Sequence, residues 1–304
     1  MLEKVPIEEI IIRPPVEGSS LSTLIAVTGG CSWNKCKFCN TYRGAYGVIQ
    51  DYGIRPIEDV KKDIDYYAKI NRHGFPVFLA GGNPTSAPTD YLEEIIKYVR
   101  EKIHNVPRIS CYSKALDILR KTEEELKRLA DAGLDIVYMG LESGSSKILR
   151  IMRKGTNAES MIKAGKKVLD AGIKLSLYII LGLGGKKYSK DHVKETSRVL
   201  TEINPTIFRF RTLNIIPNSD LWIDWKNGDF EPLSPVENLI EERDIIANLG
   251  EKVTSQVFND HISNYVDIET PNIKEDREMF LKTLDYYIND PRVKNMPRKN
   301  LTRM

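Results

Sequence analysis

The chain has 304 residues, of which 41% are hydrophobic and 29% charged, a composition typical of a globular protein with a sizeable core. Lysine and arginine number 45 against 42 aspartate and glutamate residues, and this near-neutral balance does not favour nucleic acid as a partner. No apolar run approaches the roughly 18 residues of a membrane span, and residues 1–15 lack the pattern of a secretory leader. We therefore expect a cytoplasmic protein with no membrane partner.

The first predicted elements alternate between strand and helix. In the helix at 57–70, Val60 and Ile64 belong to an apolar set with helical spacing. Thr122 and Glu125 form a capping-box sequence at the start of another helix, and Gly133 is its predicted stop. In chain order the elements are strand 22–27, helix 57–70, strand 76–83, helix 89–103, strand 108–113 and helix 122–133.

The alternation continues to about residue 220, after which the strand signal fades. Six βα units predict a parallel sheet with right-handed crossovers, either open or closed into a barrel. In both architectures ligands bind at the carboxyl ends of the strands. The remaining elements are strand 135–143, helices 145–155 and 158–172, strand 173–185, helix 189–203, strand 206–217 and helices 235–253 and 274–290.

Three of the four cysteines lie within nine positions, at Cys31, Cys36 and Cys39. In a reducing compartment such a cluster indicates metal or redox chemistry rather than disulfides. A closed zinc site needs a fourth ligand, and the sequence offers none nearby. Three thiolates on a short loop suit a four-iron cluster with one iron open to a small chelating ligand. A zinc or redox site is the alternative interpretation.

The cysteine segment resembles that of the radical S-adenosylmethionine (SAM) superfamily. Four and two residues separate the cysteines, where the family usually has three and two. The resemblance covers residues 20–270 and is greatest to compact members such as oxygen-independent coproporphyrinogen dehydrogenase and the catalytic subunit of Elongator. It implies an α/β fold, a partial (β/α)6 TIM-like barrel with a C-terminal helical extension. Residues 1–220 would form the barrel and residues 221–304 a helical segment closing the same domain.

The resemblance also implies the chemistry. Cys31, Cys36 and Cys39 would hold a [4Fe–4S] cluster, at which SAM is reductively cleaved to a 5′-deoxyadenosyl radical that abstracts hydrogen from a substrate. Such an oxygen-sensitive enzyme needs an electron donor such as ferredoxin or flavodoxin. We expect a small-molecule substrate. An RNA-modifying radical SAM enzyme and a non-catalytic iron–sulfur or zinc protein are the alternatives. Cys111 alone cannot hold a second cluster, and we expect it to be a small buried residue rather than a hydrogen donor.

Further motifs at strand ends match the family's cofactor-binding segments. The resemblance places Phe38 and either Ile180 or Leu181 near the adenine, and Glu142 near the ribose or the methionine amine. Without the resemblance, Gly81 and Gly82 could form an ordinary βα turn, and Glu142 could be a solvated carboxylate at a helix start. The methionine amine would meet Gly81, Gly82 and Asn83, and its carboxylate Arg153 and Lys154.

Two features near the end of the barrel sequence are candidates for substrate contact. Arg209 and Arg211 alternate on an otherwise apolar strand and so share one face, where they would be paired or would bind an anionic substrate. An outward-facing position is the alternative. His261, Asn264 and Tyr265 resemble a His-x-x-Asn-Tyr phrase near the C-terminus of one superfamily branch, and a purely structural role for them is equally open.

Overall fold

The computed structural model describes residues 22–44, 49–71 and 74–297, so the N-terminal segment assessed for a leader lies outside it. The chain forms two compact units, each discontinuous in sequence. The first comprises the described residues within Met1–Asn34, Thr41–Met139 and Ala164–Leu175, and the second those within Lys35–Asn40, Gly140–Lys163 and Ser176–Met304.

The first unit is a parallel sheet covered by helices. Its strands lie in the order β1 (Thr23–Ala26), β4 (Val77–Ala80), β5 (Ile109–Ser113) and β6 (Ile136–Glu142), whose last three residues belong to the second unit. All four side chains of β4 are fully buried. Burial of a Val, Leu or Phe side chain contributes about 1.5–3 kcal/mol, so these central strands form much of the core.

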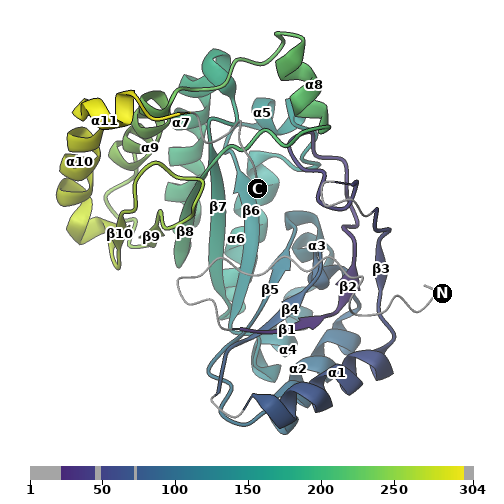
Figure 1. Ribbon diagram of the computed structural model, residues 1–304. Helices are drawn as coiled ribbons and strands as arrows, with labels where there is room; N and C mark the ends of the chain where they lie inside the picture. Colours follow the sequence, from purple (N-terminus) through teal and green to yellow (C-terminus); the bar gives the residue numbers. More distant parts are fainter. Residues whose placement is uncertain (1–21, 45–48, 72–73, 298–304) are drawn as a thin grey trace. The chain divides into compact units, whose positions relative to one another are not determined.

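The helices of the first unit begin and end close to where the sequence predicts. Helix α2 (Thr89–Lys102) lies between α1 (Ile57–Ile70) and α4 (Glu123–Ala132) (Figure 1). The predicted capping box at the start of α4 is present, with Thr122 accepting a hydrogen bond from the Glu125 backbone N–H. Gly133 ends this helix at a φ of +108°, a conformation that favours glycine.

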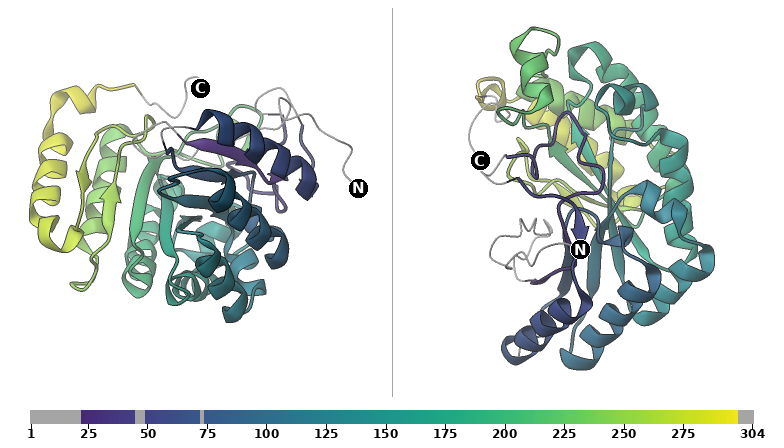
Figure 2. Two further views of the ribbon diagram at one scale, coloured as in Figure 1. Left: turned by 90° about the horizontal axis from the view of Figure 1, so that it is seen from below. Right: turned by 90° about the vertical axis from the view of Figure 1, so that its right-hand side faces the viewer.

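The second unit continues the alternation. Its parallel strands are β7 (Lys174–Leu181), which begins in the first unit, β8 (Ile207–Thr212) and β9 (Gln256–Phe258). Strand β10 (Glu269–Thr270) pairs antiparallel to β9. Helix α9 (Pro235–Ala247) contacts both α7 (Gly185–Ile203) and α10 (Ile273–Asn289), and Figure 2 shows the C-terminal helices from two further sides.

The helical prediction for residues 221–304 is incomplete, because this segment contains β9 and β10 as well as helices. Strands of three and two residues are too short to produce a periodic signal. Several short elements were not predicted from the sequence. None of the described helices combines the length and the hydropathy of a membrane span. The elements not yet given are β2 (Thr28–Gly29), β3 (Gly53–Ile54), the 3-10 turn η2 (Pro84–Ser86), α3 (Ala115–Arg120), α5 (Ser146–Ile151), α6 (Ala158–Asp170), α8 (Asp220–Lys226) and α11 (Pro291–Lys294).

Candidate cofactor site

In the first unit, the end of β4 lies directly against the backbone that leads to the first cysteine. The Gly82 backbone N–H donates to the Gly30 carbonyl at 3.0 Å. A Cβ atom at Gly82 would lie 2.3 Å from that carbonyl oxygen and 2.7 Å from Cys31 Cα. Gly81 has a φ of +130°, and a Cβ there would lie 2.1 Å from Thr28 Oγ1. Both glycines are therefore required by a close approach of backbone segments, whether or not they also contact SAM.

Asn83 is fully buried and fixes the residue that follows Cys31. Its Oδ1 accepts from the Ser32 N–H at 3.0 Å, and its Nδ2 donates to Ser32 Oγ at 2.9 Å and to Asp117 Oδ2 at 2.7 Å. Lys114 Nζ also donates to Ser32 Oγ, at 2.5 Å. Burial raises the pKa of Asp117, opposed by nearby Lys114 and the Asn83 hydrogen bond. Asn83 thus positions the cysteine segment, through partners that the sequence analysis did not identify.

The other two cysteines lie in a turn that belongs to the second unit. The Cys39 N–H donates to the Cys36 carbonyl at 3.3 Å. Between them, the Lys37 N–H donates to the Met152 carbonyl after α5 at 3.0 Å, and the Lys37 carbonyl accepts from Leu221 N–H of α8 at the same distance. Lys37 Nζ forms an ion pair with Asp224 at 2.6 Å. These contacts hold the cysteine turn against the ends of two helices.

The donor set of the chain fits the cluster that the sequence predicts. Cys31, Cys36 and Cys39 form no disulfide, and each is partly exposed. Cys111 is buried, and burial raises the pKa of its thiol to about 12, so it remains protonated and unsuited to bind iron. Over the described ranges, no group of three or more His, Cys, Asp and Glu residues is already gathered as a metal site. Three accessible thiols without a fourth thiol or imidazole in their segment match a cluster with one open iron.

An ion pair stands at the end of β6. Glu142 Oε1 lies 2.6 Å from Lys154 Nζ, and both side chains are largely buried. Lys154 Nζ also lies 5.9 Å from the centre of the Phe38 ring. Gly140 makes room for this pair, because a Cβ there would lie 2.0 Å from Glu142 Oε1 and 2.8 Å from Lys154 Nζ. Glu142 is therefore not the solvated carboxylate that the sequence left open.

Arg153 does not join this pair. Its backbone has a φ of +52°, and its side chain is 59% exposed and forms an ion pair with Asp220 at 3.1 Å. The two adjacent residues thus have different partners, Asp220 for Arg153 and Glu142 for Lys154, and a contact of both with the methionine carboxylate stays a prediction.

A hydrophobic cluster gathers two of the predicted adenine neighbours. Phe38 and Ile180 are partly buried and pack against the same set of apolar side chains. Leu181 is 1% exposed and, one position further along β7, points to the opposite face of the strand. Of the two residues that the sequence offered, Ile180 is thus the one that accompanies Phe38. The cluster consists of Ile148, Met152, Leu183, Leu213, Ile215, Leu221 and Phe230.

Buried polar groups tie together the segments that follow β6 and β7. His192 Nδ1 lies 2.8 Å from Ser143 Oγ, and Glu241 Oε2 accepts from the Gly182 N–H at 2.5 Å. Glu241 also accepts from Ser189 Oγ at 2.7 Å and lies 3.7 Å from His192 Nε2. Burial lowers the pKa of His192 to about 4 and raises that of Glu241 to about 7. The neutral imidazole of His192 and the buried carboxyl group of Glu241 therefore position the segments after β6 and β7. No local sequence pattern predicts either residue.

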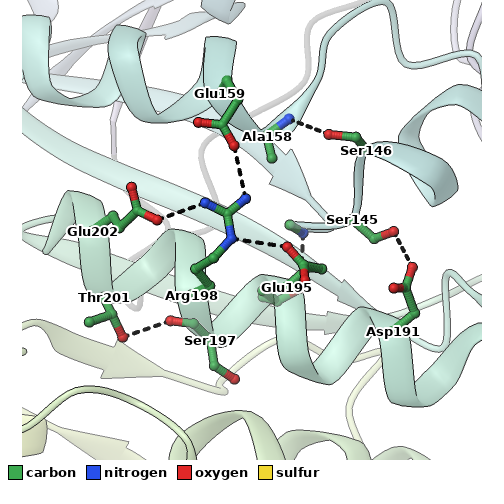
Figure 3. A network of polar contacts seen from close by, with 12 residues as sticks. Ser145, Ser146, Ala158, Glu159, Asp191, Glu195, Ser197, Arg198, Thr201 and Glu202 are labelled. Carbon is green, nitrogen blue, oxygen red and sulfur yellow. Dashed lines mark hydrogen bonds and ion pairs between the residues drawn. The ribbon is translucent and has the colours of Figure 1, made fainter.

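Helix α7 also anchors the segment after β6. Ser145 caps α5 by accepting from the Ile148 N–H at 3.3 Å and donates to Asp191 (Figure 3). Arg198 forms hydrogen bonds with Glu159 of α6 and with Glu195 and Glu202 of its own helix, at distances between 2.7 and 3.0 Å. The side chains of α7 thereby fix the start of both helices that follow the Glu142 segment.

The predicted substrate residues near the end of β8 differ in how far their polar atoms are paired. Asn264 is buried; its Oδ1 accepts from the Thr212 N–H at 2.7 Å and its Nδ2 donates to the Phe210 carbonyl at 2.9 Å. Tyr265 is 7% exposed. Arg209 forms an ion pair with Asp260 at 2.8 Å. Asn264 thus secures the loop at 259–264 against β8. Among these predicted residues, the buried side-chain nitrogens without a hydrogen-bond partner are Nε of Arg209 and both Nε and Nη2 of Arg211.

Comparison with known proteins identifies the class. The model of the radical SAM superfamily matches residues 25–200, more than half of the chain. The chain belongs to the radical SAM superfamily, as the sequence predicted. Its members are enzymes that bind a [4Fe–4S] cluster and SAM.

Solved structures support the fold. One is the Elp3 protein of the archaeon Methanocaldococcus infernus, with a TM-score of 0.51 and 15% identity over 86% of this chain and 63% of that one. Another is coproporphyrinogen III oxidase (HemN) from Escherichia coli, with a TM-score of 0.52 and 18% identity over 74% of this chain and 51% of that one. The mixed α/β fold with its parallel sheet is that of radical SAM partial barrels, which confirms the predicted fold class.

Curated relatives are distant and often longer. An uncharacterized protein of Methanocaldococcus jannaschii is 24% identical over 88% of this chain and 79% of its own length. A tRNA uridine(34) acetyltransferase of the same organism is 25% identical over 76% of this chain, which spans only 49% of that protein. The superfamily is established by the comparisons, whereas the substrate is not.

Proposed function

We propose that the protein reductively cleaves SAM and uses the resulting radical to abstract hydrogen from a small-molecule substrate. The observation that carries this proposal is the convergence of Phe38, Lys154 and Ile180 in one unit: an aromatic ring, a buried ion pair and an aliphatic side chain around one apolar cluster. An adenosyl group needs apolar contact, and an amino acid moiety needs charge. These are the groups that the site provides.

The residues would divide the cofactors between them. Cys31, Cys36 and Cys39 would hold the cluster, which when bound supplies the electron that breaks a carbon–sulfur bond of SAM. Lys154 would pair with the methionine carboxylate, as a point charge rather than a bidentate fork. Glu142, released from Lys154, would then accept hydrogen bonds from the amine or the ribose. Phe38 and Ile180 would contact the adenine.

The supporting architecture gives other residues positioning roles. Asn83, through Ser32, would hold the segment of Cys31, while Gly81 and Gly82 allow the backbones to approach. We further propose that residues 1–220 carry the barrel and residues 221–304 close the same domain; the family match to residues 25–200 supports the first part. A ferredoxin or flavodoxin would deliver the electron, and a cytoplasmic location stays a prediction.

The test is direct. The protein is reconstituted anaerobically with iron and sulfide, reduced with dithionite and incubated with SAM, and 5′-deoxyadenosine is measured by chromatography. We expect a brown protein that forms 5′-deoxyadenosine at a rate that depends on dithionite. A reconstituted, folded protein that binds iron and forms none would reject the proposal in favour of a non-catalytic iron–sulfur protein.

RNA modification is a second candidate, because a relative that aligns with 76% of the chain is named a tRNA uridine(34) acetyltransferase. The two candidates differ in what consumes the radical. If the substrate is tRNA, adding unmodified tRNA should accelerate 5′-deoxyadenosine formation and yield a new nucleoside by mass spectrometry. For the small-molecule function that we favour, a metabolite extract freed of RNA should do so instead.

A further inference from the structure

One face of the strands β7 and β8 in the second unit carries two arginines. Tyr178 pairs with Arg209 across the parallel ladder, and Ile180 pairs with Arg211. Side chains alternate along a strand, so these four share a face, while the neighbouring Ile179 and Phe210 lie on the other. Arg211 is thus the direct cross-strand neighbour of the residue that we propose to contact the adenine.

The two arginines are not equivalent. Arg209 is 4% exposed, its Nη1 lies 2.8 Å from Asp260 Oδ1, and its guanidinium carbon lies 4.3 Å from the centre of the Phe258 ring. A carboxylate therefore compensates its charge, and a ring covers its face. This answers the open question from the sequence for Arg209, which is paired inside the protein.

Arg211 has the ring but no carboxylate. Its guanidinium carbon lies 4.3 Å from the centre of the Tyr178 ring. Its Nε and Nη2 atoms are buried and have no hydrogen-bond partner, and none of the ion pairs of the described residues includes it. Buried guanidinium nitrogens without partners are costly. Nε and Nη2 lie on one edge of the planar group, the edge that receives two oxygens of a carboxylate or phosphate.

His261 adds a donor to the same region. Its Nδ1 accepts from the Ser263 N–H at 3.1 Å, so a neutral ring carries its proton on Nε2. Burial, together with the positive charges of Arg211 and Arg209, lowers the pKa of His261 to about 4, and Asp260 only partly opposes this. The ring is neutral at physiological pH, and the positive potential that it senses favours an anion.

We propose that Arg211, held flat by Tyr178 and assisted by His261, binds an anionic group of the substrate, a carboxylate or a phosphate, with two parallel hydrogen bonds from Nε and Nη2. The inference rests on the proposed function, because it places this anionic group beside the adenosyl site. It names the chemical class that the substrate must carry and separates Arg211 from Arg209, which binds Asp260 instead.

The first experiment uses the wild-type holoenzyme with SAM bound under anaerobic conditions. Phenylglyoxal modifies arginines that are at least partly exposed, as Arg211 is as a whole although its Nε and Nη2 are buried. The rate at each position is followed by peptide mass spectrometry, with inorganic phosphate, succinate or chloride at equal ionic strength. We expect phosphate or succinate to slow modification of Arg211 by at least about threefold, as a bidentate contact would. Arg292, exposed and paired with Asp290, is the internal control and should be modified equally in all three salts.

The second experiment compares Arg211→Lys, Arg211→Ala and the control Arg292→Ala by calorimetric titration with whichever anion protects. We expect affinity for that anion to fall by about tenfold or more in both Arg211 variants, because Lys keeps the charge but not the two-donor edge. Far-UV circular dichroism and the iron content after reconstitution report the folding of both Arg211 variants independently of activity, and Arg292→Ala, outside the proposed site, should keep the wild-type rate of 5′-deoxyadenosine formation.

The outcomes separate the two proposals. Protection by phosphate alone indicates a phosphate ester as substrate, and protection by succinate alone indicates a carboxylic acid. Equal modification of Arg211 in all three salts, or full anion affinity in Arg211→Ala, overturns the anion site while leaving SAM cleavage intact. A wild-type enzyme that forms no 5′-deoxyadenosine but protects Arg211 retains the anion site and rejects the proposed function.

Discussion

The carboxylate of Glu142 lies 2.6 Å from the ammonium group of Lys154, in a space that exists because residue 140 is glycine. Glu142 itself has a φ of +62°, an uncommon conformation for a residue with a side chain. Such strain at the end of a strand is typical of functional sites, where surrounding contacts hold it. The pair is the most specific arrangement of charge in the candidate site.

Replacing Gly140 by Ala should displace this pair. The added methyl would meet the ends of the Glu142 and Lys154 side chains, which can move, so we expect the fold to survive. Affinity for SAM in the reconstituted enzyme should fall by about tenfold, measured by equilibrium binding. Gly172→Ala is the control: it meets nothing within 4 Å but has a φ of +83°, so it should lower Tm without changing SAM affinity. Equal SAM affinity in both variants would contradict a role for the pair.

Substitutions of the adjacent cations Arg153 and Lys154 should differ in their effect on KM for SAM. In Lys154→Met the partly buried charge is lost, and we expect KM for SAM to rise by about tenfold or more, with a smaller rise in Lys154→Arg. In Arg153→Met an exposed ion pair with Asp220 is lost, so KM should change by less than about twofold. Steady-state kinetics of 5′-deoxyadenosine formation measure both. A larger effect of Arg153→Met than of Lys154→Met would reverse our assignment.

Gly82 should be intolerant of any side chain. In Gly82→Ala the Cβ would lie 2.3 Å from a backbone oxygen, which cannot move without shifting the Cys31 segment. We expect a loss of stability on the order of 1–3 kcal/mol and reduced iron content after reconstitution. In Gly29→Ala, two residues before Cys31, the nearest atoms would lie at 3.7 Å, an ordinary contact. This variant should keep its iron, and a similar loss in both would show that the clash is not the cause.

Cys36 and Cys111 should differ in cluster content. Cys36→Ala removes a partly exposed thiol at the start of the turn that ends at Cys39, and we expect iron, sulfide and the brown absorbance to be lost. Cys111→Ala leaves a small cavity in the core, with lower Tm but full cluster content. Iron and sulfide assays together with thermal unfolding decide. Full iron in Cys36→Ala would exclude it as a ligand.

The buried glutamate of α9 predicts a dependence of stability on pH. Burial raises the pKa of Glu242 to about 8 from 4.5. Between these two pH values the folded chain holds a proton that the unfolded chain has lost. Stability therefore falls as pH rises towards 8. His192, with its pKa lowered to about 4 from 6.5, acts in the opposite direction only below pH 6.5.

Urea unfolding of the cluster-free chain between pH 6.5 and 8 isolates the effect of the glutamates. The free energy of unfolding should fall, with Glu242 accounting for roughly 2 kcal/mol at most. Glu242→Gln keeps an acceptor for Asn259, which donates to both carboxylate oxygens at 2.8 and 2.9 Å, and should flatten the slope. The dependence of stability on pH that remains in this variant is that of Glu241, whose pKa is raised to about 7. Glu251→Gln, at an exposed position, should match the wild type, and an unaltered slope in Glu242→Gln would refute the assignment.

Most of the helices and strands could be predicted from local sequence patterns. Helix α1 begins and ends where its apolar spacing indicates, and the capping box of α4 forms from Thr122 and Glu125 as predicted. By contrast, β9 has only three residues, and its position depends on pairing with β8, about fifty residues earlier in the chain. Such pairing cannot be read from a short window.

The same division applies to the site. Glu142, Lys154 and the pair Ile180 or Leu181 were named from motifs that resemble those of the superfamily, and their contact with a cofactor stays a prediction. The need for Gly140 did not, because it arises from where two other side chains meet. Nor did the contact of Glu241 with the Gly182 N–H, which joins residues 59 positions apart. Arg209 and Arg211 were equivalent in sequence and became distinct only through Asp260.

The cysteine turn carries a consequence for biosynthesis. Lys37 is held by Met152, Leu221 and Asp224, the last of them 187 residues further along the chain. A ribosome therefore releases the turn long before it makes the residues that shape it, and the two thiols emerge without their scaffold. Iron and sulfide delivered during translation would reach a cysteine turn that has not yet folded. Assembly factors should act on the finished polypeptide.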